Sequence, residues 1–301
     1  MSSEFKSYDK IETSSAKWPS SYSKVKSWAV TEKVHGANFS FIYDPVTKMF
    51  SYGKRTGTLG PLDNFFNFKA ILPEILPKIE KVVELVESKQ IKFSKLICFG
   101  ELFGGTHPMY TSEFIPVQKG ISYSPNLHWI GFDIYLVKPD GTGAYMDFAD
   151  SIEIFKSAGV LYAEPLKVFT KLSDALNYPI GFQSTIPKKL GYESVPNNKA
   201  EGIVVRSMTG RFVVKIKIPE FSESKYSDNS VGTTDLFAIA ETHITANRFA
   251  NAISKVGPDD VQLAWSLMVT DILDELDLPE GKQRKQLGEH LYKRMVHSFP
   301  N

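Results

Sequence analysis

Cysteine is almost absent from this chain, because Cys98 is the only one among 301 residues. A single thiol cannot form an intramolecular disulfide, and it excludes a zinc site built from four cysteines. Cys98 lies in the apolar run 96–99, so we expect it to be a buried core thiol rather than a reactive one.

Long hydrophobic runs are also missing, since no segment reaches the roughly 18 apolar residues that a membrane-spanning helix needs. The first 17 residues have no apolar core, and they mix Glu4, Asp9 and Glu12 with serines and lysines. These features argue against a secretory signal or a transit peptide. We therefore expect a cytoplasmic protein, or an intracellular one encoded by a virus or phage.

An excess of one charge is the third absence, because the formal net charge at pH 7 is only +1. Total charge therefore does not indicate a nucleic-acid partner, and any basic binding surface has to be local. The content of 42% hydrophobic and 23% charged residues is typical of a globular protein. The length predicts about two domains.

The first three quarters of the chain alternate between strand and helix patterns. Segments that alternate apolar and polar residues between turn residues predict strands at 28–34, 37–43, 49–53, 95–103 and 128–137, a hairpin partner at 144–148, and a hairpin of 201–206 with 211–217. Apolar residues at helical spacing predict a helix over 64–90 that Pro73 and Pro77 split, and a shorter helix over 150–159. We expect a short strand at 161–170, a short helix at 171–177 and a polar loop at 185–198.

The composition changes at about residue 234, where a polar, serine-rich stretch ends. Helical spacing then predicts three helices: one over 242–255, one capped by Asp259, and one over 279–297. We therefore predict two domains, an α+β domain at 1–234 and a small all-helical domain at 235–301.

The segment EKVHGANF places Lys33 at the end of a predicted strand and Gly36 three residues later. A lysine amine is a nucleophile only in its uncharged form, which burial and neighbouring cations favour. Gly36 lets the backbone turn or approach a neighbour where a Cβ atom would block it. Taken alone, the pattern equally describes a surface lysine before a turn.

Four further segments carry charge in unusual places. Each has an ordinary interpretation as well: a solvated turn for Arg55 in GKRTG, a strand-end acid facing water for Glu101 in FGELFGG, and a solvated basic edge for Lys215 and Lys217 in VVKIK. Glu201 opens the fourth segment, EGIVVR, at the start of the hairpin whose other strand carries the two lysines. The lysines are two residues apart on a strand, so they share a face and repel unless an anion lies between them.

Together and in this order, these segments resemble the covalent nucleotidyltransferase superfamily of ATP-dependent ligases and capping enzymes. His35 and Asn38 after the lysine are similar to the branch that contains RNA ligase 2 and the RNA-editing ligases, and so is the segment VQKGISYSPN at 117–126. The resemblance implies a nucleotidyltransferase domain of antiparallel sheets with flanking helices. It covers residues 33–217.

The resemblance also implies a role for each matching residue. Lys33 corresponds to the nucleophile that forms a lysine–AMP bond. His35 and Asn38 correspond to residues needed for ligation, and Arg55 to an arginine that contacts the nucleotide and the RNA 5′ end. The remaining correspondences are Glu101 to the ribose-binding acid, Phe132 and Val204 to the two sides of the adenine, Glu201 to the acid near the metal and nucleophile, Lys215 and Lys217 to the α-phosphate pair, and Glu32 to the nucleotide-binding set.

The implied reaction is ATP-dependent joining of RNA 3′-hydroxyl and 5′-phosphate ends, with Mg²⁺ or Mn²⁺ as the metal. Attack on an α-phosphate builds negative charge that positioned cations stabilise, which suits Lys215 and Lys217. Mg²⁺ takes mostly water with one or two carboxylates and phosphates, so one acid such as Glu201 is enough.

The region after residue 217 lacks the five-strand pattern of the OB-fold that DNA ligases and capping enzymes carry. This favours an RNA ligase whose helical domain binds duplex or bridged RNA with a nick. Six basic residues there could contact phosphates or simply face water: His243, Arg248, Lys255, Lys282, Arg284 and Lys285. A DNA ligase, a guanylyltransferase and a non-catalytic nucleic-acid-binding module remain as alternatives.

Overall fold

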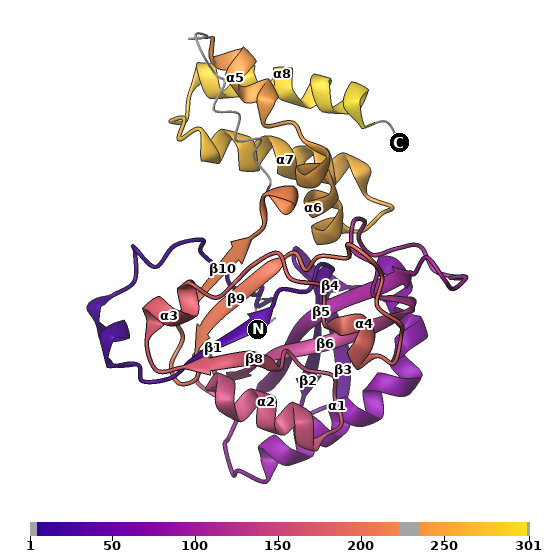
Figure 1. Cartoon of the computed structure of the whole chain (residues 1–301), viewed down its shortest axis with the longest axis vertical. Coiled ribbons are helices and arrows are strands. Elements are labelled where there is room, and N and C mark those ends of the chain that lie inside the picture. The colour runs from indigo at the N-terminus through magenta and orange to yellow at the C-terminus, as the bar shows by residue number, and fades with distance from the viewer. Residues whose placement is uncertain (1–4, 223–234, 300–301) are drawn as a thin grey trace. The chain divides into compact units, whose positions relative to one another are not determined.

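The computed structural model describes residues 5–222 and 235–299 (Figure 1). The chain divides into two compact units, Met1–Ile218 and Pro219–Asn301. The predicted domain boundary between residues 234 and 235 adjoins residues 223–234, which lie outside the described part, so it stays a prediction. Each unit is described by itself below.

The first unit contains a four-stranded antiparallel sheet in the order β10-β9-β1-β8. Its strands are β1 (Trp28–Glu32), β8 (Pro165–Phe169), β9 (Gly202–Ser207) and β10 (Val213–Lys217). Apolar side chains with small exposed fractions lie against one of its faces: Trp28, Val30, Ile203, Val205 and Val214. This core holds β1 and β9 rigidly side by side, and their ends carry the predicted lysine and glutamate.

A second, six-stranded antiparallel sheet has the order β4-β3-β2-β5-β6-β7. Its strands are β2 (Ala37–Asp44), β3 (Met49–Lys54), β4 (Gly57–Leu59), β5 (Lys95–Thr106), β6 (Ser124–Val137) and β7 (Gly143–Tyr145). The predicted strands are confirmed, and β5 and β6 are longer than their patterns indicated. The expected α+β class with antiparallel sheets is therefore confirmed.

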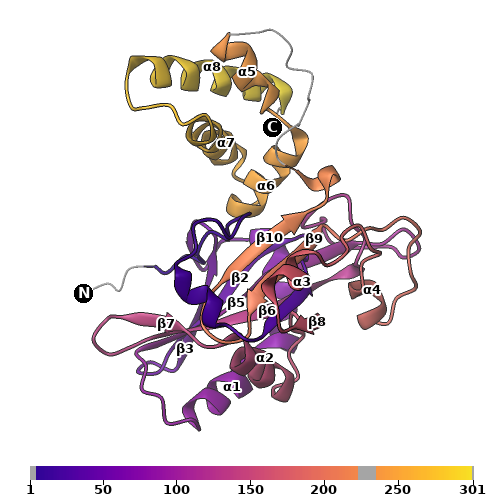
Figure 2. The same cartoon turned by 60° about the vertical axis from the view of Figure 1, so that its left-hand side comes forward.

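Helices α1 (Leu72–Glu87) and α2 (Phe148–Ser157) lie next to each other beside the six-stranded sheet (Figures 1 and 2). The expected split at Pro77 is wrong, because α1 continues through this residue. The break comes earlier, where Phe66 and Asn67 have positive φ angles inside the 3₁₀ segment η2 (Phe65–Ile71). Pro73 occupies the first turn of α1, where its missing N–H costs no helical hydrogen bond.

Three short helical elements also belong to the first unit: η1 (Ser20–Lys24), α3 (Leu172–Leu176) and α4 (Ile186–Lys189). Gly159, with a positive φ angle, forms the turn after α2. The polar segment 185–198 was expected to be a loop throughout, and α4 corrects this. Its apolar residues Ile186 and Pro187 are buried, which supports a single helical turn in an otherwise polar stretch.

Residues 33–36 carry the chain from the four-stranded sheet into the six-stranded sheet. Gly36 permits this crossing, because a Cβ atom at this position would lie 2.2 Å from the carbonyl oxygen of Leu102 in β5. Close approach to β5, rather than a positive φ angle, therefore requires glycine. The crossing places the predicted nucleophile between the end of β1 and the start of β2, which are interior strands of the two sheets.

Helices form the described part of the second unit: α5 (Leu236–Thr242), α6 (Ala246–Val256), α7 (Val261–Glu275) and α8 (Lys282–Ser298), after the 3₁₀ turn η3 (Pro219–Phe221). The helix predicted over 242–255 starts too early, because Thr242 is the last residue of α5 and α6 begins only at Ala246. The Thr245 hydroxyl caps α6 by accepting from the Arg248 N–H. The N-cap of α7 is Asp260 rather than Asp259. Ala264, Met268, Leu287 and Leu291 belong to a continuous buried core.

No helix within residues 5–222 and 235–299 combines the length and the apolar character that crossing a bilayer requires.

Candidate active site

Lys33 and Glu201 meet at the shared end of β1 and β9. The two strands pair in antiparallel register with Glu32 opposite Ile203, and the Lys33 N–H donates to the Gly202 carbonyl at 3.0 Å. This register brings Lys33 and Glu201 to the same end of the strand pair, and the Lys33 Nζ lies 2.6 Å from Glu201 Oε2. Two residues far apart in the sequence are therefore ion-paired because the strands that carry them are neighbours.

Two more side chains converge on the Glu201 carboxylate, which is only 1% exposed. His35 Nδ1 lies 3.2 Å from Oε2, and Lys217 Nζ lies 3.1 Å from Oε1. Burial alone would raise the pKa of Glu201, but Lys33, His35 and Lys217 outweigh it and hold this pKa far below its ordinary value. Glu201 is therefore a carboxylate at neutral pH, and it holds the ends of three segments together.

Glu101 forms a second acidic position on β5, directly opposite Asn38 of β2. The Gly36 N–H donates to Glu101 Oε1 at 3.2 Å, and the Asn38 amide donates to the Gly100 carbonyl at 3.4 Å. Loss of solvation raises the pKa of Glu101 to about 7, although Lys33 and Arg55 act in the opposite direction. Glu201 acts in the same direction as the loss of solvation, so the charges of all three residues influence Glu101.

Arg55 and Phe132 lie on the six-stranded sheet, at the end of β3 and within β6. The Phe132 ring is partly exposed and meets the ring of Tyr8 edge-on, with 4.9 Å between their centroids. Arg55 is half-buried and donates to the main-chain carbonyl of Tyr8. Both side chains therefore contact residues near the N-terminus, a segment in which the sequence indicated little structure.

Lys215 and Val204 lie opposite each other on β10 and β9, and both side chains are partly exposed. The pairing confirms that the lysines of VVKIK are on a strand, with Val214 buried on its other face. The contact of Lys217 with Glu201 joins this strand to the Lys33 cluster. The strand therefore carries basic side chains toward the same end of the sheet as the nucleophile candidate.

Glu32, which was expected to belong to the nucleotide-binding set, binds Ser184 and Thr185 through its carboxylate. Its oxygens accept from the Ser184 hydroxyl at 2.5 Å and from the N–H and hydroxyl of Thr185, both at 2.7 Å. Burial raises the pKa of Glu32, and these hydrogen bonds lower it. The side chain of Glu32 therefore fixes the segment before α4.

Two residues that the sequence patterns did not single out support the segment after Lys33. The hydroxyl of Tyr123 accepts from the His35 N–H at 2.9 Å, and Tyr123 is buried. Asn198 holds the neighbouring Ser122 through two hydrogen bonds of 2.8 and 2.7 Å. Tyr123 lies in the segment 117–126 that contributed to the resemblance, whereas Asn198 is a polar loop residue without any periodic signal.

A buried ion pair, Asp133 with Arg206, was also missed. It joins β6 of the larger sheet to β9 of the smaller one, and the side chains are 1% and 4% exposed. Arg211 also donates to Asp133, at 3.0 Å. A signal did exist, because an acid within GFDIY and an arginine within EGIVVR each interrupt an apolar strand, where unpaired charge is costly.

Four of the six basic residues considered in the helical unit take part in ion pairs within that unit. Arg248 and His243 pair with Glu275, Lys255 with Asp271, and Arg284 with Asp274. Lys282 and Lys285, on α8, have exposed side chains. The first four therefore have a structural role that the sequence did not reveal.

Basic and acidic side chains gather around the candidate nucleophile. Lys33, Lys217 and Arg55 bring positive charge beside two acids, Glu201 and Glu101. Within 5–222 and 235–299, no group of three or more acids, histidines or cysteines is arranged to hold a metal ion on its own. Any metal ion here would therefore need oxygen ligands from a bound substrate or from water.

The family model described as "RNA ligase" matches residues 26–217. The mitochondrial RNA-editing ligase 2 of Trypanosoma brucei brucei is 29% identical over 294 residues, which cover 77% of this chain and 70% of the relative. The mitochondrial RNA-editing ligase 1 of the same organism is 29% identical over 241 residues, which cover 66% of this chain and 50% of the relative.

Among solved structures, a mutant of the Naegleria gruberi RNA ligase with ATP and manganese aligns with a TM-score of 0.50 and 14% sequence identity. The alignment covers 71% of this chain and 57% of that one. This likeness shows the fold. The chain spans about half to two thirds of the length of most of these relatives.

The fold is that of the RNA ligase nucleotidyltransferase domain. The family match covers most of the first unit, and the chain belongs to the RNA ligase family. The resemblance inferred from the sequence motifs is confirmed at the level of the family.

Proposed function

We propose that this protein is an ATP-dependent RNA ligase that joins a 3′-hydroxyl end to a 5′-phosphate end. The observation that carries the proposal is the contact of Lys33 Nζ with the buried Glu201, beside His35 and Lys217. A positioned amine among cations is what attack on a nucleotide α-phosphate requires. Family membership, relatives named as RNA-editing ligases, and a related fold that holds ATP and manganese support it.

The first step would transfer AMP to the enzyme. The Lys33 ammonium gives a proton to water, and the free amine attacks the α-phosphorus of ATP. A phosphorus–nitrogen bond forms, and the bond to the β-phosphate oxygen breaks so that pyrophosphate leaves. Lys217 and Lys215 would stabilise the charge on the α-phosphate oxygens. Glu101 would accept from the ribose, and Phe132 and Val204 would cover the two sides of the adenine.

The second and third steps would use the stored AMP. An oxygen of the RNA 5′-phosphate attacks the α-phosphorus, the phosphorus–nitrogen bond breaks, and Lys33 regains its proton. The 3′-hydroxyl then attacks the RNA phosphorus, and AMP leaves as the new phosphodiester forms. We assign His35, Asn38 and Arg55 to these steps. His35 contacts Glu201, Asn38 lies opposite Glu101 on the neighbouring strand, and the charge of Arg55 acts on Glu101.

The residues present would hold a divalent ion only together with ligands from water or from the bound phosphates. Both oxygens of Glu201 already contact Lys33, His35 or Lys217, so Glu201 would reach Mg²⁺ or Mn²⁺ mainly through metal-bound water. When bound, such an ion would neutralise charge on the phosphates. Glu201 itself holds the amine of Lys33 through their ion pair.

The finer substrate class that we propose is a nick in duplex or bridged RNA. The helical unit would contribute to duplex binding, and Lys282 and Lys285 are the first residues to test because their side chains are exposed on α8. Contacts with phosphates would make binding weaken steeply as salt increases.

A nick-sealing panel tests the proposal. Four labelled nicks carry RNA or DNA on the 3′-hydroxyl side and on the 5′-phosphate side, with ATP or GTP as the nucleotide. We expect sealing with ATP when the 3′-hydroxyl side is RNA, and loss of sealing in Lys33→Ala. Preferential sealing of all-DNA nicks would identify a DNA ligase, labelling by GTP would identify a guanylyltransferase, and RNA binding without nucleotide transfer would identify a non-catalytic module.

A further inference from the structure

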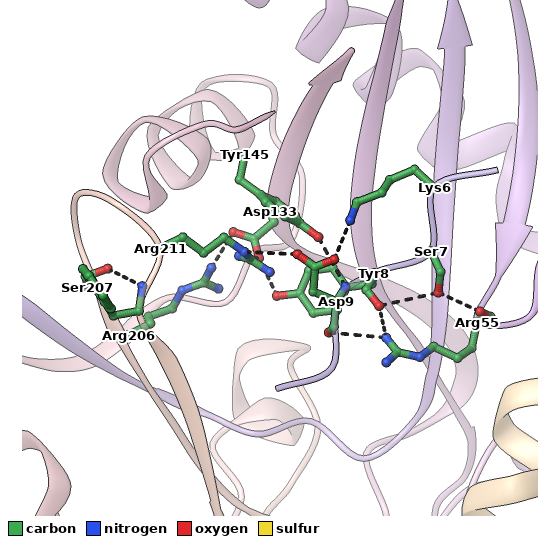
Figure 3. A network of polar contacts seen from close by, with 11 residues as sticks. Lys6, Ser7, Tyr8, Asp9, Arg55, Asp133, Tyr145, Arg206, Ser207 and Arg211 are labelled. Atoms are coloured by element: carbon green, nitrogen blue, oxygen red, sulfur yellow. Dashed lines mark hydrogen bonds and ion pairs between the residues drawn. The ribbon is translucent and has the colours of Figure 1, made fainter. Parts of the chain in front are cut away.

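Residues 5–12, here called the N-terminal strap, lie against Arg55 through their main chain (Figure 3). Arg55 Nη1 donates to the carbonyl oxygen of Tyr8 and, at 3.5 Å, to that of Asp9. In return, the Ser7 hydroxyl donates to the Arg55 carbonyl at 2.8 Å. Both the side chain and the main chain of Arg55 are therefore held by the strap.

Tyr8 anchors the strap in the core of the first unit. Its side chain is 5% exposed, and its hydroxyl donates to Asp133 Oδ2 at 2.6 Å. Its ring packs edge-on against Phe132, and its centroid lies 5.1 Å from that of Phe99. Asp133 is in turn held by Arg206 and Arg211, so the anchor depends on a buried ion pair between the two sheets.

The other end of the strap reaches the strand that carries the two lysines. The Lys215 N–H donates to the Glu12 carbonyl at 2.9 Å, and Glu12 forms a parallel bridge with Val214. Asp9 also donates its N–H to the Tyr145 hydroxyl at 3.3 Å. The strap therefore runs from Arg55 on the larger sheet to β10 on the smaller one.

We propose that the N-terminal strap is a positioning segment of the active site and that its Tyr8 and Asp9 carbonyls hold the Arg55 guanidinium ready for its anion. An arginine side chain has many rotamers, and fixing it before the substrate binds removes an entropic cost from the reacting complex. Two carbonyl contacts at Nη1 orient the plane of the guanidinium, so its other donor nitrogens point in a fixed direction. This inference rests on the proposed role of Arg55 toward the nucleotide and the RNA 5′ end.

Coupling to Arg55 distinguishes positioning from general support of the fold. A strap that acts through Arg55 has nothing left to position once that side chain is gone. A strap that only stabilises the unit would affect the enzyme equally in both backgrounds. A double-mutant cycle measures this difference, because residues that act together give non-additive losses.

The experiment uses the full chain and measures two rates: labelling of the enzyme by α-labelled ATP, and single-turnover transfer of AMP from labelled enzyme to a 5′-phosphorylated nicked RNA. The variants are Ser7→Ala, Tyr8→Ala, Tyr8→Phe, Arg55→Ala and each strap variant combined with Arg55→Ala. Thr13→Ala is the matched control, since Thr13 follows the strap and is exposed. Thermal unfolding of each variant reports whether it folds.

We expect Tyr8→Ala to slow the step that Arg55→Ala slows by about tenfold, and Ser7→Ala by about threefold. In the Arg55→Ala background each should slow that step by less than about twofold, and Thr13→Ala should change nothing. Tyr8→Phe keeps the ring and should fall between Tyr8→Ala and the unchanged protein. If Tyr8→Ala does not fold, Ser7→Ala and Tyr8→Phe decide the question.

Losses that multiply in the double variants, or strap variants with unchanged rates, would overturn the inference and leave the proposed function intact. An Arg55→Ala protein with unchanged rates in both steps would overturn the role of Arg55, and the inference with it. Absence of label on the unaltered protein would overturn the proposed function itself.

Discussion

Lys33 and Glu201 are separated by 168 positions in the sequence, yet their side chains are joined by a 2.6 Å ion pair at the end of two neighbouring strands. The carboxylate in this pair is almost fully buried, and it also contacts His35 and Lys217. An acid with three such partners cannot be removed without leaving positive charge unbalanced. The predictions below follow from this arrangement and from the strands that produce it.

Glu201→Gln should nearly abolish labelling by ATP, with a loss of about a hundredfold or more, because Lys33 and Lys217 lose the charge that positions them. The free energy of unfolding should fall by about 3 kcal/mol, since two basic groups are left without their buried partner. Step-resolved labelling and chemical denaturation measure the two effects. Glu193→Gln, at an exposed acid in a loop, is the control. A Glu201→Gln protein that labels normally would exclude Glu201 from the site.

Glu101 should make the nucleotide-free protein less stable as pH rises from about 4.5 to 7. Its pKa is about 7 in the fold and 4.5 in the reference state, so the folded state binds more protons in this interval. The lost stability should be of the order of 2–3 kcal/mol.

Glu101→Gln carries no titrating carboxyl, so this fall should be missing from its profile of unfolding free energy against pH. The measurement is denaturation at several pH values between 4.5 and 8 for both proteins. Parallel profiles would contradict the raised pKa of Glu101.

Gly36→Ala should destabilise the first unit by about 2 kcal/mol or more, because the new Cβ atom would lie 2.2 Å from a backbone oxygen that cannot move easily. Labelling should fall as well, since the crossing that carries Lys33 would have to shift. Gly57→Ala is the matched control, with no atom within 4 Å of the added carbon. Equal melting temperatures for the two variants would show that the close approach to β5 is not a constraint.

Glu32→Gln should lower stability by about 1–2 kcal/mol, because an amide nitrogen replaces one of the two oxygens, and Ser184 donates to one of them and Thr185 to the other. If the carboxylate serves only this structural purpose, the apparent affinity for ATP should stay within about twofold once the variant is folded. Titration of ATP against the labelling rate measures this. A large rise in the ATP concentration needed, without loss of stability, would show that Glu32 takes part in nucleotide binding, as the sequence predicted.

The sequence predicted the strands well because alternation between apolar and polar residues reports directly which face is buried. The charged motifs could also be recognised from their order, and the register of β1 with β9 then explains why Lys33 and Glu201 meet. The direction in which each side chain points could not be derived from sequence patterns alone. The direction of the Glu32 carboxylate is the clearest example, because it depends on Ser184 and Thr185, over 150 residues away.

The N-terminal strap was missed for a different physical reason. It mixes Phe5, Tyr8 and Ile11 with polar residues over a run too short to predict a helix or a strand. Its main contacts with Arg55 come from backbone carbonyls, which every sequence possesses. Tyr8 becomes informative only when Asp133 and Phe132 are seen around it. The helix break at 66–67 and the continuation through Pro77 likewise depend on packing that overrides local propensity.

The most direct test of the account is to locate the AMP adduct. The full chain is incubated with α-labelled ATP and Mg²⁺, digested, and the modified peptide is sequenced by mass spectrometry. We predict one AMP on Lys33, released by pyrophosphate and by 5′-phosphorylated nicked RNA, and absent from Lys33→Ala. An adduct on another residue, or label that persists in Lys33→Ala, would contradict it.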